Sequence, residues 1–256
     1  LHPRVRRQRQ MCIRDSYFCA GCPTLEGTAD VIRTLERNGV HSIEIGIPFS
    51  DPMADGIVIQ EAATRALRNG MSLRILFEQL RDIRSDVRIP LILMGYLNPI
   101  MKFGFEAFCQ KCVECGIDGV IIPDLPFKDY EETYKPIADR YDIRVIMLIT
   151  PETSEARVRE IDEHTDGFIY MVSSAATTGA QKDFDSQKQA YFKKIQDMHL
   201  RNPRMVGFGI SNKQTFDAAC ANSSGAIIGS RFVTLLNEAE GDAEKAITQL
   251  KEGLKK

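Results

Sequence analysis

The sequence contains no long apolar run, no large net charge and no linker rich in glycine, serine or proline. No run approaches the roughly 20 apolar residues that a membrane-spanning helix needs, so the sequence predicts no membrane segment. The formal net charge of -2 favours neither a nucleic acid nor an anionic membrane as a partner. A chain of 256 residues without a dividing linker is therefore expected to form a single globular domain.

Metal-ligand clusters are also scarce. Cys19 and Cys22 form a Cys-x-x-Cys pair, and Cys109, Cys112 and Cys115 are spaced three apart. Such spacings can indicate a metal or redox site, but neither group has a fourth ligand or paired histidines nearby, so we predict no metal. The seven cysteines, in a sequence with no recognisable signal peptide, predict reduced thiols and a cytoplasmic location.

The first sixteen residues, LHPRVRRQRQMCIRDS, are basic and lack the periodicity of the rest of the chain. A transit peptide and a nucleic-acid-binding arm are alternatives, but Arg6–Ser16 resembles the translation of a transposon-type sequencing-library adapter. We therefore predict that residues 1–16 are non-native and disordered or poorly packed. The domain is then expected to span residues 17–256.

From Tyr17 onward, short apolar runs alternate with longer segments of helical spacing. Such alternation predicts a parallel sheet, and eight units in this length fit a closed (β/α)8 TIM barrel better than the alternative, an open doubly wound sheet. The first run is short, so we expect a clipped first strand with an unpaired seam beside it. The runs are Tyr17–Ala20, Ser42–Gly46, Leu91–Gly95, Gly119–Pro123, Arg144–Ile149, Phe168–Val172, Met205–Gly209 and Ala226–Gly229.

The second run alternates in character. Its isoleucines occupy one face, and Ser42, Glu44 and Gly46 occupy the other, which is expected to point into the barrel. A carboxylate inside a barrel is unfavourable unless it is paired or used in chemistry. Glu44 is thus either hydrogen-bonded to its barrel neighbours or a general acid/base with a raised pKa.

An acidic loop follows this strand and contains Asp51-Pro52 and Asp55-Gly56. Acids beside proline and glycine are often turn formers only. Asp55 is of interest because it follows the strand of Glu44, so that two carboxylates could flank one ligand.

Glycine-rich turns follow the last strands at Gly207–Ser211 and Gly229-Ser230, and Thr178-Gly179 follows the sixth. Each could be a simple turn. Two such turns on adjacent strands favour a phosphate site, because backbone N–H groups at the start of a following helix bind anions.

These motifs together resemble the tryptophan synthase alpha chain family. The resemblance rests on GIPFSDPMADG at 46–56, PDLP at 123–126, Thr178-Gly179, GFGIS at 207–211 and GAIIGS at 225–230, in that order. It implies a TIM-barrel lyase that cleaves indole-3-glycerol phosphate by retro-aldol chemistry, and it covers essentially Tyr17 to the C-terminus. Alternatives are a non-catalytic subunit that activates a partner, or another phosphate-binding barrel such as an indole-glycerol-phosphate synthase.

The resemblance also assigns roles to residues. Glu44 and Asp55 match the catalytic glutamate and aspartate, and Asp124 and Thr178 are expected to support loop closure. The indole pocket or its rim is expected at Tyr17, Ile59, Met94, Tyr96, Ile121, Leu148, Tyr170 and Phe208, and Thr178 is also expected to bind the substrate. The phosphate is expected at Gly179, Gly209, Gly229 and Ser230.

The family implies a partner as well. The chain is expected to bind a tryptophan synthase beta chain in an alpha2-beta2 heterotetramer, through the face that carries Asp51-Pro52 and Asn98-Pro99. Pyridoxal phosphate is expected only in that partner, with no cofactor in this chain. The sequence departs from the family pattern at Cys22, Ser174, Ala176 and Arg231.

Overall fold

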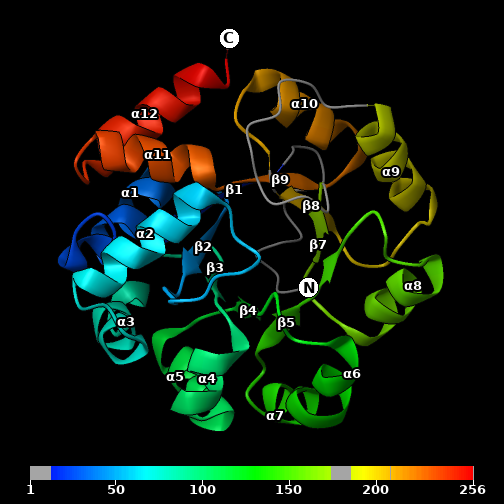
Figure 1. The fold of residues 1–256 in the computed structure, drawn as a ribbon, viewed down its shortest axis with the longest axis horizontal. Helices are drawn as coiled ribbons and strands as arrows, with labels where there is room; N and C mark the ends of the chain where they lie inside the picture. Colours follow the sequence, from blue (N-terminus) through cyan, green and yellow to red (C-terminus); the bar gives the residue numbers. More distant parts are fainter. Residues whose placement is uncertain (1–12, 174–185, 208, 256) are drawn as a thin grey trace.

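The computed structural model describes residues 13–173, 186–207 and 209–255, which alternate between strands and helices around a central sheet (Figure 1). The strands are β1 (Ile13–Cys19), β2 (Ser42–Gly46), β3 (Leu91–Met94), β4 (Gly119–Ile121), β5 (Arg144–Ile146), β6 (Leu148–Ile149), β7 (Ile169–Val172), β8 (Arg204–Gly207) and β9 (Gly225–Ile228).

The helices form the outer layer (Figure 1). They are α1 (Thr28–Arg37), α2 (Ile57–Arg68), α3 (Leu73–Leu80), α4 (Leu97–Phe103), α5 (Phe105–Cys115), α6 (Phe127–Asp129), α7 (Lys135–Arg140), α8 (Glu155–His164), α9 (Ser186–Asp197), α10 (Lys213–Asn222), α11 (Ser230–Glu238) and α12 (Ala243–Gly253). Short 3-10 helices span Leu25–Gly27 and Ile83–Ser85, and a π-helical turn spans Tyr130–Tyr134.

The sheet closes on itself. Its strand order is β5-β4-β3-β2-β1-β9-β8-β7-β6, and all the pairings are parallel. The two end strands, β5 and β6, are separated only by Met147, whose carbonyl accepts a 3.0 Å hydrogen bond from the Tyr170 N–H. They are therefore two halves of one barrel strand, the predicted run Arg144–Ile149. The prediction of a (β/α)8 barrel is confirmed.

The first strand is paired on both sides. Asp15–Cys19 lie in register with Ser42–Gly46 of β2, and Ile13–Ser16 lie in register with Gly225–Ile228 of β9. The expectation of an unpaired seam is therefore wrong. The disorder expected for residues 1–16 does not extend to Ile13–Ser16, because their backbone completes the ladder between β2 and β9. Residues 1–12 lie outside the described residues, so a boundary there stays a prediction.

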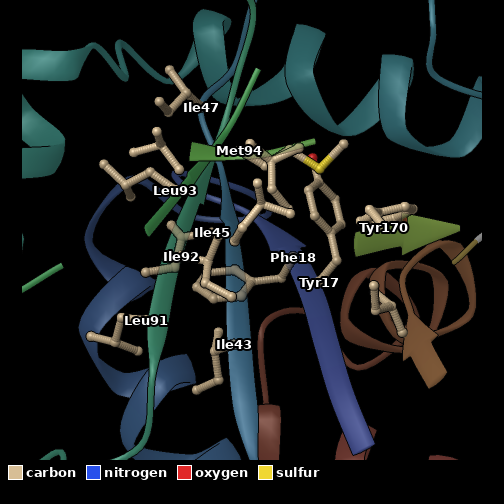
Figure 2. Packing of buried hydrophobic residues seen from close by; sticks show 14 of the residues in the cluster. Tyr17, Phe18, Ile43, Ile45, Ile47, Leu91, Ile92, Leu93, Met94 and Tyr170 are labelled. Atoms are coloured by element: carbon tan, nitrogen blue, oxygen red, sulfur yellow. The ribbon is translucent and has the colours of Figure 1, made fainter. Parts of the chain in front are cut away.

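The alternation along β2 sorts side chains between the two sides of the barrel wall. Ile43 and Ile45 are fully buried, and they pack with Leu91 and Leu93, their register partners on β3 (Figure 2). This side faces the helices, where α3 contributes a buried apolar stripe that includes Leu76 and Leu80. Burying one such leucine stabilises the fold by roughly 1.5–3 kcal/mol.

Local signals in the sequence fix where helices begin and end. The Ser72 hydroxyl accepts a hydrogen bond from the Ile75 N–H at 3.3 Å and caps α3. Gly116, with a φ of +69°, ends α5 in the left-handed conformation that glycine adopts without strain. Within the described ranges, no helix has both the length and the apolar character needed to cross a bilayer.

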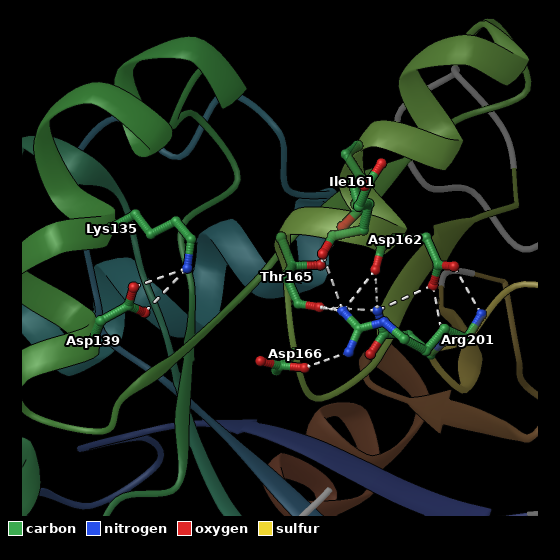
Figure 3. Close-up of polar contacts among 9 residues, drawn as sticks. Lys135, Asp139, Ile161, Asp162, Thr165, Asp166 and Arg201 are labelled. Atoms are coloured by element: carbon green, nitrogen blue, oxygen red, sulfur yellow. Dashed lines mark hydrogen bonds and ion pairs between the residues drawn. The ribbon is translucent and has the colours of Figure 1, made fainter.

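A buried polar junction fixes the end of α8 against the start of β8 (Figure 3). The Asp162 carboxylate accepts hydrogen bonds from the backbone N–H groups of Arg201 (2.7 Å) and Asn202 (2.8 Å), and from the Asn202 side-chain amide (3.0 Å). The Arg201 guanidinium donates to the carbonyl of Thr165 at 2.7 Å and binds Asp166 at 2.8 Å. The junction satisfies groups that would otherwise be buried without partners.

Candidate active site

A cavity of about 700 Å³ opens at the carboxyl ends of the strands. This is the end of a (β/α)8 barrel at which catalytic groups are found. The wall of this cavity is formed by residues of the strands, the loop after β2, the turns after β8 and β9, and the last helix. The lining residues are Tyr17, Glu44, Asp55, Ile57, Val58, Ile59, Met94, Tyr170, Gly209, Ile210, Ser211, Asn212, Ile227, Gly229, Ser230, Arg231, Thr234, Gln249, Leu250 and Gly253.

A second cavity, of about 430 Å³, lies at the opposite end of the barrel. Residues at the amino ends of strands line it, among them Ser42 of β2 and Gly119 of β4. That end of a (β/α)8 barrel serves stability rather than chemistry, so the larger cavity is the candidate active site.

Glu44 points into the barrel, as the alternation of β2 predicts. Its side chain is fully buried, it lines the cavity, and neither carboxyl oxygen has a hydrogen-bond partner. Burial, followed by the nearby Asp15 carboxyl, raises the pKa of Glu44 well above its ordinary value of 4.5. Among the described residues, Glu44 therefore forms no hydrogen bond with its barrel neighbours, and the alternative that predicted such bonds is wrong. An unsatisfied carboxyl with a raised pKa suits a general acid/base.

Asp55 also lines the cavity, from the loop that leads into α2. Its Oδ2 accepts a hydrogen bond from the Tyr96 hydroxyl at 2.9 Å, and that hydroxyl accepts one from the Ala54 N–H, also at 2.9 Å. Burial raises the pKa of Asp55 to about 6, and the Tyr96 hydrogen bond opposes part of this rise. Asp55 is therefore more readily ionised than Glu44, so the two carboxyl groups are suited to different roles.

Two tyrosines on opposite parts of the sheet complete the wall. Figure 2 shows Tyr17 on β1, Met94 on β3 and Tyr170 on β7. Each tyrosine lies over a strand-end glycine: a Cβ at Gly46 would be 2.1 Å from the Tyr17 hydroxyl, and one at Gly207 would be 2.0 Å from the Tyr170 hydroxyl. Both strand ends therefore require glycine for the tyrosines to reach the cavity.

The turns after β8 and β9 form the remaining polar wall. Gly209 has a φ of +78°, and Gly229 precedes Ser230, the first residue of α11. Asn212 caps α10 by accepting the Thr215 N–H at 2.9 Å. Two helix amino ends therefore meet the cavity, and the positive end of a helix dipole favours an anion at such a place.

Most of the predicted site residues meet at this cavity. Its lining includes Tyr17, Glu44, Asp55, Ile59, Met94, Tyr170, Gly209, Gly229 and Ser230. Tyr96 is not in the lining but holds Asp55.

Three other predicted residues lie away from the lining. Ile121 is buried on β4, Leu148 lines a separate cavity beside Phe127, and Asp124 accepts a hydrogen bond from the Leu97 N–H at 2.9 Å. Thr178, Gly179 and Phe208 lie outside the described residues, as do Ser174 and Ala176.

The sequence analysis missed the contribution of α12. Gln249, Leu250 and Gly253 line the cavity although they follow no strand end. The sequence of α12 shows an apolar stripe, in which Ala246, Ile247 and Leu250 are buried. Such a stripe predicts that the helix packs on the barrel, but it does not predict that the helix lines a cavity. Among the described residues, no group of three or more histidine, cysteine or acidic side chains is arranged to hold a metal ion.

Comparisons with known proteins show the family of the chain. A family model described as the tryptophan synthase alpha chain matches residues 6–256. The tryptophan synthase alpha chain of Bacteroides fragilis is 80% identical over 235 residues, covering 92% of this chain and 89% of that protein. That of Bacteroides thetaiotaomicron is 78% identical over 239 residues, covering 93% of each.

Solved structures match as well. A mutant tryptophan synthase alpha subunit from Pyrococcus furiosus superposes with a TM-score of 0.86 at 31% identity, covering 94% of this chain and 97% of that one. A chain of a tryptophan synthase complex from the same organism superposes with a TM-score of 0.85 at 31% identity and the same coverage.

Proposed function

This chain belongs to the tryptophan synthase alpha chain family, and we propose that Glu44 and Asp55 carry out the family's lyase reaction in it. The reaction splits indole-3-glycerol phosphate into indole and glyceraldehyde 3-phosphate, a step of tryptophan biosynthesis. One observation carries the assignment: Glu44, Asp55 and the Gly229-Ser230 turn line a single cavity.

Glu44 is the proton-transfer group. In the reaction, indole C3 gains a proton, the glycerol hydroxyl next to the scissile bond loses one, and the carbon–carbon bond breaks with its electrons returning to the ring. The Glu44 carboxylate takes the hydroxyl proton and assists protonation of C3. Its raised pKa suits both steps, because burial makes the carboxylate a stronger base than an exposed one, so it accepts a proton more readily and can return it.

Asp55 serves the other end of the indole. Its carboxylate accepts a hydrogen bond from the ring N–H and stabilises the positive charge that develops on the ring as C3 is protonated. The Tyr96 hydroxyl, 2.9 Å away, leaves the second carboxylate oxygen available for this contact. Tyr17, Met94 and Tyr170 supply apolar surface for the flat ring.

The phosphate binds at the other side of the cavity. Gly209, Gly229 and Ser230 offer backbone N–H groups and a hydroxyl where two helix amino ends converge. Arg231, where the family usually has a small residue, also lines the cavity and adds a positive charge near this wall.

The partner is a tryptophan synthase beta chain, in an alpha2-beta2 assembly that carries pyridoxal phosphate only in the beta chain. The face with Asp51-Pro52 and Asn98-Pro99 is the docking side. Met53 and Met101 beside these residues are 86% and 55% exposed, which favours burial against another protein. We expect a cytoplasmic location, because five of the six described cysteines are free thiols, namely Cys19, Cys22, Cys109, Cys112 and Cys115, whereas Cys220 is disulfide-bonded.

The test is indole release from indole-3-glycerol phosphate, measured with and without the beta chain. Glu44→Gln should lower turnover by about 100- to 10,000-fold while the circular dichroism spectrum stays native. Asp55→Asn should cause a large but smaller loss. Asp129→Asn, outside the cavity lining, is the matched control and should keep full activity. Full turnover by the Glu44→Gln protein would remove Glu44 from the proposed role.

A further inference from the structure

The side chain of Tyr17 spans the candidate active site between two strand-end glycines. Its Cβ and Cγ lie against Gly229, since a Cβ added at that glycine would be 3.6 and 3.9 Å from them. Its hydroxyl lies against Gly46, where an added Cβ would be only 2.1 Å away. In Figure 2 the ring extends from β1 toward Met94, the register partner of Gly46 on β3. The side chain therefore runs from the turn after β9 to the carboxyl end of β2.

The Tyr17 hydroxyl occupies the place of a side chain on the inward face of β2. Glu44 and Gly46 share that face, and the glycine leaves its own side-chain position vacant. The Tyr17 hydroxyl fills this position, one repeat of about 6.6 Å further along the strand than Glu44. It therefore lies at the end of the strand that carries Glu44, whereas the stem of the side chain adjoins the proposed phosphate turn.

This hydroxyl has no acceptor within the protein. Across the described ranges of the chain, no hydrogen bond joins the Tyr17 hydroxyl to another residue, and Tyr17 lines the cavity. The Tyr96 hydroxyl, by contrast, already donates to Asp55. Burial, followed by the nearby Cys19 and Asp55, raises the pKa of Tyr17 well above its ordinary value of 10. The phenol therefore keeps its proton and can donate it in a hydrogen bond to a ligand.

The chemistry of the substrate supplies the acceptor. Indole-3-glycerol phosphate carries two glycerol hydroxyls between its ring and its phosphate. The proposed function places the phosphate at Gly229-Ser230 and the proton transfer at Glu44, so the glycerol chain crosses the space that Tyr17 spans. The oxygen next to the scissile bond loses its proton to Glu44 and carries negative charge until the aldehyde forms. A neutral donor beside that oxygen stabilises the developing charge.

We propose that the Tyr17 hydroxyl is a further catalytic group, which donates a hydrogen bond to the glycerol oxygen next to the scissile bond. The proposal rests on the proposed function, and it adds a polar contact to a residue that the family resemblance assigns only to the indole pocket. Glu44 takes the proton of that oxygen, and the electron pair of the broken O–H bond forms the aldehyde carbonyl. The carbon–carbon bond breaks toward the ring, while Tyr17 retains its own proton throughout.

A kinetic test compares Tyr17→Phe with the parent chain in the indole-release assay. We expect kcat to fall about tenfold and KM to rise no more than about threefold, because a hydrogen bond to a developing charge is strongest in the transition state. Tyr191→Phe is the matched control, since the Tyr191 ring is similarly buried and its hydroxyl donates to the Ile149 carbonyl at 3.3 Å, outside the cavity lining. The control should keep the kcat of the parent. An unchanged kcat in Tyr17→Phe would overturn the proposal.

A binding test identifies the ligand atom that the hydroxyl contacts. It uses Glu44→Gln protein, in which turnover is blocked, and two ligands: indole-3-glycerol phosphate, and indole-3-propanol phosphate, which lacks both glycerol hydroxyls. Adding Tyr17→Phe should weaken binding of the first ligand about threefold by calorimetry and leave binding of the second unchanged. Equal weakening of both ligands, or of neither, would contradict the proposed contact.

Urea unfolding separates a catalytic role from a structural one. Because the hydroxyl has no protein partner in the described part of the chain, Tyr17→Phe should unfold at the same midpoint as the parent or at a higher one. A lower midpoint together with lost turnover would assign the hydroxyl a structural role and overturn the proposal. Full turnover by Glu44→Gln would contradict the proposed function alone, because the kinetic comparison of Tyr17→Phe with the parent still tests the hydroxyl.

Discussion

The phenolic hydroxyl of Tyr96 lies 2.9 Å from Oδ2 of Asp55 and donates a hydrogen bond to it. The same hydroxyl accepts the N–H of Ala54, so it fixes both the carboxylate and the backbone of the loop that carries it. The Tyr96 ring packs against Phe49 with ring centroids 5.4 Å apart, and this contact restricts the position of the Tyr96 hydroxyl. Tyr96, expected to line the indole pocket, thus contacts Asp55 and fixes the position of its carboxylate.

Tyr96→Phe should lower indole release about tenfold, because one hydrogen bond to a charged group contributes roughly 1.5–3 kcal/mol, only part of which acts on the reaction. The bond favours ionised Asp55, so its removal should raise the pKa of Asp55 further and move the Asp55-dependent acidic limb of the rate profile to higher pH. The phenylalanine retains the contact with Phe49. Tyr134→Phe, whose ring packs on Phe105 away from the cavity, is the control and should leave the profile unchanged.

Glu44→Met should abolish lyase activity and yet raise the free energy of unfolding by roughly 1–3 kcal/mol, because it replaces a buried carboxyl group that lacks partners. The folded-state pKa of Glu44 lies above its ordinary value of 4.5, so the folded protein binds the extra proton above that pH. Stability of the parent chain should therefore fall as pH rises from about 4.5, and the advantage of the variant should grow.

Urea unfolding at pH 4.5 and pH 7.5 measures this difference. Glu36→Met is the matched control, because the Glu36 carboxylate accepts the N–H groups of Arg88 and Ile89 at 2.7 and 3.0 Å. It should lower the free energy of unfolding. A stability gain in both variants would show that the unsatisfied carboxyl group of Glu44 is not the cause.

Gly46→Ala should destabilise the protein by roughly 1–3 kcal/mol, because the new methyl group would lie 2.1 Å from the Tyr17 hydroxyl and force the ring to move. Combining it with Tyr17→Ala should recover much of that loss, which a double-mutant cycle would measure as a coupling energy. Gly253→Ala, with no atom within 4 Å of the added Cβ, is the control and should be neutral or stabilising. Simple additivity of the two changes would contradict the predicted contact.

Asp162→Ala should lower the free energy of unfolding by roughly 3 kcal/mol, because it leaves the backbone N–H groups of Arg201 and Asn202 without an acceptor. Indole release per folded molecule should stay unchanged, since the junction is not part of the cavity. Lys135→Met removes the exposed pair with Asp139 (2.9 Å; Figure 3) and should change stability by less than about 1 kcal/mol. Thermal unfolding of both variants measures the two losses of stability, so that the contribution of the buried Asp162 junction can be compared with that of the exposed ion pair.

The alternation of β2 shows why much of the site could be predicted from the sequence. A period of two assigns Glu44 to the interior unambiguously, and the rule that chemistry gathers at strand ends brings Asp55, Gly209 and Gly229 to the same place. These inferences need only local pattern and barrel geometry.

Other features depend on contacts that no local pattern records. The packing of α12 over the cavity is a tertiary contact between segments far apart in the sequence, and a helical apolar stripe is compatible with many partners. The inward position of Asp15 depends on a strand that begins at Ile13, before the predicted first run. The hydrogen bond between Tyr96 and Asp55 depends on side-chain conformations in two separate loops.

The wall of the cavity draws on residues from Tyr17 to Gly253. A nascent chain emerging from the ribosome therefore has no substrate site until almost every residue is free to fold, however early the first strands pair. Proteolytic trimming of the last helix would likewise remove Gln249, Leu250 and Gly253 from the wall and open the cavity to water, so we expect turnover to depend on an intact α12.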